Sequence, residues 1–125
     1  MLKRIFVLDD NQDILDIIKE VLSYEKFEVK ITSNSEQIIE NLKTYHPDLV
    51  ILDYKLNRNK GDEICRQIKT DYQLYNTPVI ICSAYLDNNI NLLTCGCDAT
   101  IAKPFGLDEL IDKVNGLIAA SVAIN

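Results

Sequence analysis

The sequence has no long apolar run, and this excludes two kinds of segment. Near the amino terminus, Met1-Leu2-Lys3-Arg4 carries two basic residues, but the apolar run at residues 5–8 is far too short for a signal peptide or a membrane span. No internal repeat, low-complexity tract or linker is present. We therefore expect a single cytoplasmic domain over residues 1–125, large enough at 47% hydrophobic residues to bury its own core.

Positive charge is also scarce. The chain has 13 lysine and arginine residues against 19 aspartate and glutamate residues, for a formal net charge of −6. The phosphate backbone of nucleic acid and an anionic membrane surface both repel such a domain. The composition therefore disfavours either one as a direct partner.

Histidine is nearly absent, which limits the metal sites that the four cysteines could form. The single histidine, His46, precedes Pro47 in a predicted turn, where we expect a solvated loop residue. Cys95-Gly96-Cys97 has neither a histidine nor a second cysteine pair nearby to complete a zinc site. Cys65 and Cys82 fall within apolar periodic stretches and are predicted to be small core residues.

The sequence does contain a regular alternation of strand and helix patterns, centred on residues 47–53. Four apolar residues in a row lie there between Pro47-Asp48 and Asp53, which predicts a strand buried on both faces. Residues 5–8 and 79–82 predict two more such strands, and residues 99–102 a short one. Residues 27–32 alternate between apolar and polar, which predicts a strand at the edge of the sheet.

Helical patterns separate these strands. In the first helix the apolar residues recur at helical spacing: Ile14, Ile18, Val21 and Leu22. The predicted starts are Asn11 or Gln12 for the first helix, Ser33-Asn34-Ser35 for the second and Gly61 for the third, with a closing helix over 107–118. A fourth helix over 85–94 is the weakest, because its asparagines are poor helix formers. Five strands alternating with five helices predict an α/β fold, with a parallel sheet covered by helices on both faces.

Polar residues stand where four of these strands end. Asp9, Asp10, Asp53, Ser83 and Lys103 are each the last residue of a predicted strand or lie just beyond it. Because the carboxyl ends of parallel strands share one edge of the sheet, we expect these five side chains to converge.

Such a group of side chains favours phosphoryl transfer. Three neighbouring carboxylates repel one another unless a cation compensates them, and hard oxygen ligands favour Mg²⁺. A lysine and a serine hydroxyl suit the oxygens of a phosphoryl group, and a carboxylate can itself be the nucleophile. The residues therefore predict magnesium-dependent phosphoryl transfer onto one of the aspartates.

With these residues the chain resembles the receiver domain of two-component response regulators, in particular single-domain regulators of the chemotaxis type. The resemblance covers essentially the whole chain, and the set of motifs is specific in order and spacing. The matching residues are Asp9-Asp10, Asp53, Gly61, Ser83-Ala84 and Lys103-Pro104-Phe105. The resemblance implies a flavodoxin-like, doubly wound sheet with the strand order 2-1-3-4-5.

The resemblance also implies a role for each site residue. Asp53 would be the phosphoacceptor, and Mg²⁺ would be held by Asp10 directly, by Asp9 mainly through water, by Asp53 and by the backbone carbonyl of Lys55. Ser83 and Lys103 would contact the phosphoryl oxygens, with a cis bond before Pro104.

The implied partners are proteins. The phosphoryl donor would be a phosphohistidine on a histidine kinase or a phosphotransfer protein, and a downstream protein would bind the phosphorylated domain. The domain would not be an enzyme beyond catalysing its own phosphorylation and dephosphorylation.

Four positions either depart from the usual pattern of the family or are variable in it. Asn57 stands where proline is common, and Lys55 and Tyr85 occupy the variable positions that tune the lifetime of the phosphoryl group. Thr100 replaces the aromatic or histidine residue that usually acts as a rotating switch. We therefore expect segment 87–94, with Tyr85 as the moving aromatic residue, to carry the conformational change instead.

Three other classes of protein are alternatives to this assignment. A flavodoxin-like carrier is disfavoured because Asp9-Asp10 would repel its phosphate, and an aspartate-nucleophile phosphatase would need an acid where Lys55 stands. The remaining alternative is an interaction module of the same fold that works without phosphorylation. A complete set of aspartates and lysine favours the phosphorylated form over this module.

Overall fold

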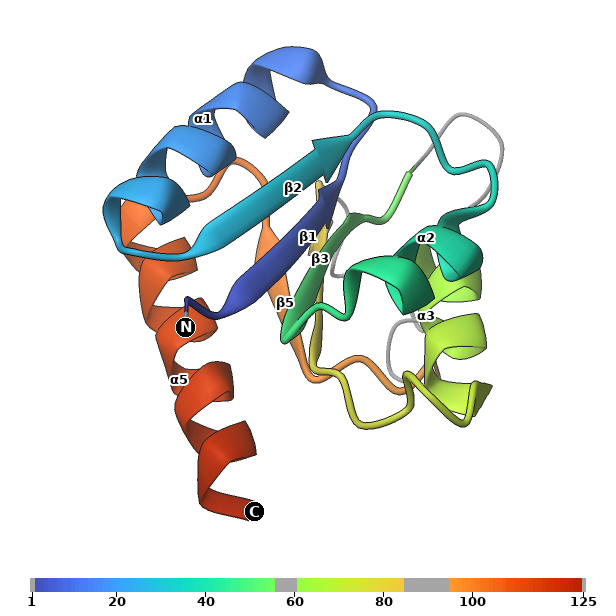
Figure 1. Ribbon diagram of the computed structural model, residues 1–125. Helices are drawn as coiled ribbons and strands as arrows, with labels where there is room; N and C mark the ends of the chain where they lie inside the picture. Colours follow the sequence, from blue (N-terminus) through green and yellow to red (C-terminus); the bar gives the residue numbers. More distant parts are fainter. Residues whose placement is uncertain (1, 56–60, 85–94, 125) are drawn as a thin grey trace.

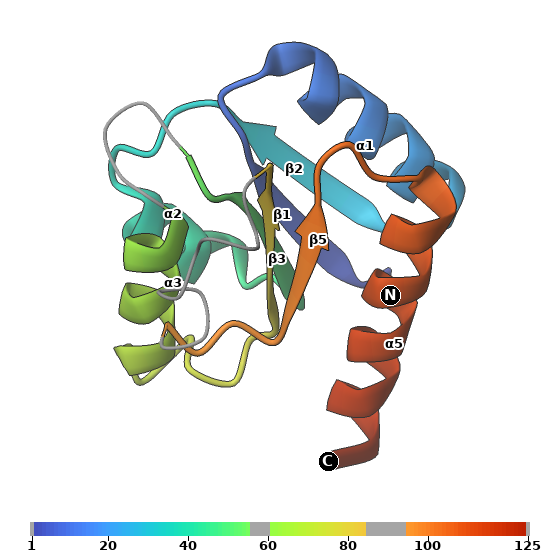
Figure 2. The ribbon, with the colours of Figure 1, turned by 180° about the vertical axis from the view of Figure 1, so that it is seen from behind.

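Five strands form one sheet with helices on both sides (Figures 1 and 2). The computed structural model describes residues 2–55, 61–84 and 95–124, with side chains described as far as 121. The strands are β1 (Arg4–Leu8), β2 (Glu28–Thr32), β3 (Leu49–Asp53), β4 (Val79–Ser83) and β5 (Ala99–Ala102). The helices are α1 (Gln12–Tyr24), α2 (Ile38–Tyr45), α3 (Gly61–Thr70) and α5 (Leu107–Ile124). The fourth helix predicted over 85–94 lies outside the described residues.

The strands pair in the order β2-β1-β3-β4-β5, and all four pairs are parallel. This confirms the α/β class, the strand order that the resemblance implied and the edge position predicted for the second strand. In such a sheet all strands run in the same direction, so the residues after their carboxyl ends lie along one edge.

The central strands are buried on both faces because their apolar residues alternate between two core layers. Phe6 and Leu8 of β1 face the layer that packs with α2 and α3, whereas Ile5 and Val7 pack with α1 and α5. Figure 2 shows these two pairs of helices on opposite sides of the sheet. β3 and β4 repeat the alternation, and every residue of both strands is buried. Continuous apolar strands of this kind are stable only when helices cover both faces.

Helix α1 starts as predicted, and its buried face includes Ile18 and Leu22 of the predicted residues. The side chain of Asn11 caps it by accepting hydrogen bonds from the backbone N–H groups of Asp13 and Ile14 at 2.9 and 3.3 Å. The fully buried residues are Leu15, Ile18 and Leu22. The prediction omitted Leu15, while Ile14 is only partly buried.

Helix α2 begins later than predicted. The Asn34 side chain accepts a hydrogen bond from the backbone N–H of Glu36 at 2.8 Å, which holds a turn where the prediction had placed the helix start. Gln37 then adopts a left-handed conformation with φ 54°, and regular helix starts at Ile38. A local bond from an asparagine side chain therefore competes with helix formation here.

The isolated histidine and the two core cysteines lie where the sequence predicted. His46 is exposed just beyond the end of α2, and its backbone N–H bonds to the Leu42 carbonyl oxygen. Cys65 and Cys82 are buried, on opposite faces of the sheet. Within the described part of the chain, no helix combines the length and the apolar character needed to cross a membrane.

Candidate functional site

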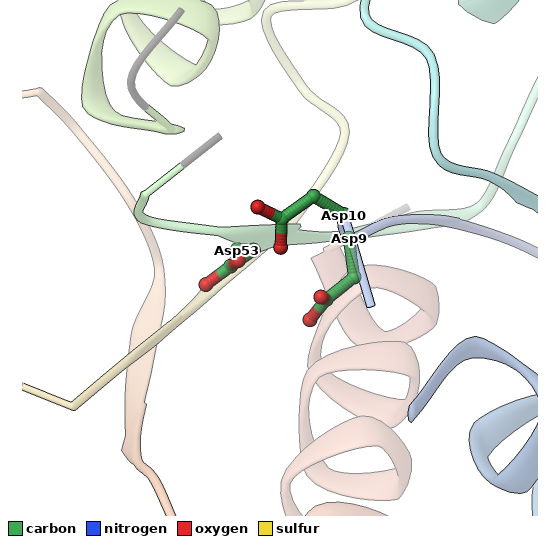
Figure 3. A group of neighbouring side chains, drawn as sticks. All are labelled: Asp9, Asp10 and Asp53. Atoms are coloured by element: carbon green, nitrogen blue, oxygen red, sulfur yellow. The ribbon is translucent and has the colours of Figure 1, made fainter. Parts of the chain in front are cut away.

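Three carboxylates gather at the carboxyl edge of the sheet. Asp9 and Asp10 follow β1, and Asp53 is the last residue of β3, the neighbouring strand. One oxygen from each of the three lies within 4.8 Å of the others, and Figure 3 shows the side chains around one space. Asp9 and Asp53 are buried and Asp10 is exposed, so solvent reaches the group from the side of Asp10. The convergence of these aspartates, predicted from the sequence, is thereby confirmed.

Lys103 joins this group from the end of β5. Its Nζ lies 2.9 Å from Asp9 Oδ2 and 3.1 Å from Asp53 Oδ1, so one ammonium bridges two of the carboxylates. The Lys103 backbone N–H donates to the carbonyl oxygen of Ser83 at 2.9 Å, which fixes the start of the loop against β4. The Lys103–Pro104 peptide bond is cis.

The electrostatics of the site show an excess of negative charge. Burial, together with the nearby charge of Asp9, raises the pKa of Asp53 from 3.8 to about 6, although Lys103 acts in the opposite direction. Burial alone would lower the pKa of Lys103, but its bonds to Asp9 and Asp53 outweigh this and raise it. One ammonium therefore does not balance three carboxylates, and a bound cation would relieve the repulsion.

The two aspartates after β1 differ in what already binds them. Asp9 Oδ1 accepts a hydrogen bond from the Asn11 backbone N–H at 2.9 Å, while Asp9 Oδ2 pairs with Lys103. Asp10 makes no hydrogen bond or ion pair with the other residues that the structure describes. The roles expected of these residues, direct metal binding by Asp10 and binding mainly through water by Asp9, stay predictions. The sequence pattern predicted Asn11 as a possible helix start and did not reveal its backbone contact with Asp9.

Of the other predicted site residues, the structure describes some and not others. Ser83 ends β4 and is buried, and the exposed Lys55 follows β3 two residues after Asp53. Thr100 lies in the middle of β5, partly buried and in register with Ile81 of β4. Tyr85 and Asn57 lie outside the described residues, as does segment 87–94. The roles assigned to these residues stay predictions.

Gly61 has a structural role that the sequence did not reveal. Its backbone N–H donates to the Tyr54 carbonyl oxygen at 2.6 Å. A Cβ at this position would overlap the backbone carbonyl oxygen of Asp53 and lie 3.0 Å from Tyr54 Cα. Only a residue without a side chain lets α3 start this close to the phosphoacceptor candidate.

Gly61→Ala is therefore expected to destabilise the protein by about 1–3 kcal/mol, the usual cost of overpacking. Gly116→Ala is the matched control, because a Cβ there meets nothing within 4 Å and alanine is the better helix former by roughly 0.5–1 kcal/mol. Urea unfolding of both variants measures the difference. Equal midpoints for the two variants would contradict the close contact at Gly61.

An apolar cavity lies beside the site, between α1 and the loop after β5. Its volume is about 530 Å³, and Lys103 and Ala84 connect it to the carboxylates. Ile14, Ile17 and Ile18 of α1 form one wall, and the residues opposite them are Pro104, Phe105 and Leu107. Ile17 is 48% exposed and Leu107 40%, so this apolar surface is open to solvent.

The chain matches the family model for the response regulator receiver domain over residues 5–115. Among curated proteins, it is 33% identical to the nisin biosynthesis regulatory protein NisR of Lactococcus lactis over 94% of this chain and 51% of that protein. It is also 33% identical to hybrid signal transduction histidine kinase D of Dictyostelium discoideum, over 95% of this chain and 8% of that protein. The chain thus spans about half the length of the curated regulator, and far less of the kinase.

Solved structures that resemble this chain over its whole length are also receiver domain proteins. A CheY-like response regulator receiver domain protein from Methanospirillum hungatei is 27% identical, with a TM-score of 0.92 and full coverage of both chains. A receiver domain protein from Clostridium thermocellum is 29% identical, with a TM-score of 0.89, covering 99% of this chain and all of that one. The sheet order, the carboxylates with their lysine and these matches agree: the chain belongs to the response regulator receiver domain family of two-component systems.

Proposed function

We propose that Asp53 accepts a phosphoryl group from a phosphohistidine in a Mg²⁺-dependent reaction. The donor is a histidine kinase or a histidine phosphotransfer protein, and the phosphorylated domain then changes its binding to a downstream protein. The observation that carries this proposal is the single space shared by the oxygens of Asp9, Asp10 and Asp53, with Lys103 bonded to two of these carboxylates.

The residues at the site fit magnesium. The donor set is made only of hard oxygen ligands, and the raised pKa of Asp53 reflects uncompensated negative charge. Asp10 would bind the ion directly, Asp9 would hold it mainly through water, and Asp53 and the Lys55 carbonyl would complete the protein ligands. When bound, Mg²⁺ would offset the repulsion between the carboxylates and the charge of an incoming phosphoryl group.

The proposed step needs Asp53 as an ionised nucleophile. An oxygen of its carboxylate forms a bond to phosphorus while the phosphorus–nitrogen bond of the donor breaks, and the imidazole keeps the electron pair of that bond. With a pKa of about 6, Asp53 is mostly ionised at neutral pH even before a metal binds. Lys103, already 3.1 Å from Asp53 Oδ1, is placed to bind an oxygen of the transferred group, and Ser83 would bind another.

The domain is proposed to catalyse only its own phosphorylation and dephosphorylation, and not to be an enzyme otherwise. A cytoplasmic location and the absence of direct nucleic-acid binding are part of the same proposal. The net charge of −6 supports the second of these.

A small phosphoryl donor with and without Mg²⁺ tests the proposed reaction. Intact-mass spectrometry is expected to show one added phosphoryl group per chain in Mg²⁺ and almost none after chelation. Equal uptake in both conditions would contradict the role given to the metal. No uptake in either would support the alternative, an interaction module that works without phosphorylation.

The apolar cavity supports a protein donor. A phosphohistidine can reach Asp53 only if its own protein docks beside the site, and the exposed apolar surface of Ile17 and Leu107 lies in the same cavity lining as Lys103. Desolvation of apolar surface is the usual core of such an interface.

Ile17→Glu is therefore expected to slow phosphoryl transfer from a protein donor about tenfold, the effect of losing one interface contact worth about 1.4 kcal/mol. Transfer from a small donor should not change, because the site itself is untouched. Ser23→Glu adds the same charge to an exposed position near the far end of α1 and should leave both rates unchanged. An equal loss with both donors would show that the substitution damages the site and not the docking.

A further inference from the structure

Folding brings a third cysteine to Cys95-Gly96-Cys97. Cys65 of α3 is fully buried, and its thiol donates a weak hydrogen bond to the Cys95 carbonyl oxygen at 3.6 Å. The Cys95 thiol lies near both the Cys65 and the Cys97 thiols and contributes to the raised pKa of each. Cys65 is 30 positions before Cys95 in the sequence, yet the fold brings them together. We call Cys65, Cys95 and Cys97 the thiol cluster.

The thiol cluster has a buried end and an accessible end. Cys65 and Cys95 are 0% and 2% exposed within the core layer beneath α3, whereas Cys97 is only partly buried. Gly96 between them has φ 88°, a conformation that glycine adopts without strain. The three sulfur atoms do not all lie within 4.8 Å of one another. In the described part of the chain, the three aspartates are the only group of potential metal ligands that meets this distance. Binding of one atom by all three thiols therefore requires a movement, which the proposal assigns to the partly buried Cys97.

The surroundings of the thiol cluster favour a ligand whose complex with the thiols carries no net charge. Lys69 packs its side chain near Gly96, but its ammonium is already bonded to Asp98 at 2.8 Å and to the Thr77 carbonyl oxygen at 2.8 Å. Asp98 also accepts a hydrogen bond from the Val79 backbone N–H at 2.8 Å, so neither group is available to balance a buried thiolate. Burial raises the pKa of the Cys97 thiol to about 12 and raises that of Cys65 as well. These thiols keep their protons, which disfavours disulfide formation through a thiolate.

We propose that the thiol cluster binds a trivalent thiophilic hydroxide, of which arsenous acid is the simplest example. In this reaction three As–O bonds break and three As–S bonds form. Each thiol proton leaves in a water molecule, and arsenic stays in the trivalent state. The product carries no net charge, so its burial avoids the cost of an unpaired ion. Zn²⁺ held by the same three thiolates would leave a net charge of −1, and the neighbouring Lys69 ammonium is already bonded to Asp98 and to the Thr77 carbonyl oxygen.

Binding of arsenite to the whole chain under reducing, thiol-free conditions tests this. Native mass spectrometry should show one arsenic per chain with the loss of three hydrogens. Cys95→Ala and Cys65→Ala should each weaken binding by a factor on the order of a hundred or more, the gain from one additional tethered ligand. Cys97→Ser, at a partly exposed position, should weaken it similarly without any risk to the core. Cys82→Ala is the matched control, because Cys82 is an equally buried thiol on the other face of the sheet and should leave binding unchanged.

Magnesium-dependent binding of beryllium fluoride at Asp53 serves as the check that each variant is folded. Arsenic uptake by Cys97→Ser at the wild-type affinity would overturn the proposal, as would loss of only two hydrogens from the wild-type protein. Zn²⁺ binding as tight as that of arsenite would overturn it as well, because zinc held by three thiolates carries a net charge of −1 and the proposal requires an uncharged product.

Discussion

Asp53→Asn is expected to abolish phosphoryl uptake and, in the absence of metal, to make the protein more stable. Uptake is lost because the amide is not the nucleophile that the carboxylate is. Stability rises because the pKa of Asp53 is about 6 in the folded protein against 3.8 for the ordinary carboxyl group. The folded state therefore holds the proton of Asp53 more tightly than the unfolded chain does.

The stability effect has a definite pH window. The contribution from Asp53 is fully present below pH 3.8 and is lost as the pH rises through about 6, where the buried carboxylate becomes charged. At pH 7 the asparagine variant avoids this cost, for an expected gain of about 1–3 kcal/mol. In saturating Mg²⁺ the difference should shrink or reverse, because the wild-type protein gains stability from the ion that it binds.

Urea unfolding at pH 5 and pH 7, with and without Mg²⁺, measures this. Asp62→Asn is the matched control, because Asp62 is 3% exposed, lies next to Gly61 and is not one of the three clustered carboxylates. That variant should keep phosphoryl uptake. Wild-type uptake by the Asp53→Asn protein would contradict the assignment of the acceptor.

Lys103→Met is expected to slow phosphoryl uptake from a small donor by a factor of about 10²–10³, the usual effect of removing one charged or hydrogen-bonding group that stabilises a transition state. The lysine also lowers the pKa of Asp53, so its loss should leave less of the nucleophile ionised at pH 7. Both effects act in the same direction. They follow from the two contacts of Lys103 Nζ with Asp9 and Asp53.

Lys69→Met is the matched control for this experiment. Lys69 and Lys103 have the same side-chain exposure, 18%, and each forms an ion pair with an aspartate. Lys69 pairs with Asp98, which follows Cys97 and precedes β5, so its loss should cost stability without changing the rate of uptake. If the two variants lost activity equally, the effect would come from general destabilisation and not from the phosphoryl site.

The site was predictable from the sequence because parallel sheets leave little freedom at their carboxyl edge. Asp9, Asp53 and Lys103 each follow an apolar strand, and once the strands are parallel these residues must lie together. Asn11 was predictable as a helix cap for a similar reason, since an asparagine before a helical pattern satisfies the first free N–H groups.

The missed features depend on contacts between segments or on local bonds that periodicity does not describe. Helix α2 starts later than predicted because a hydrogen bond to the Asn34 side chain stabilises a turn before it. The need for glycine at residue 61 follows from the position of the Asp53 backbone. Cys65 meets Cys95 only once α3 packs against β3 and β4, beside the turn before β5. In each case the deciding atom lies in a segment that the local pattern does not include.

Locating the phosphoryl group by peptide mass spectrometry tests the central claim most directly. The wild-type protein is treated with a small phosphoryl donor and Mg²⁺, and the acyl phosphate is trapped by borohydride reduction before digestion. The account predicts a single modified residue, Asp53, whose oxygen lies beside Lys103 Nζ in the structure. Modification at Asp9 or Asp10, or at a residue away from this edge of the sheet, would contradict it.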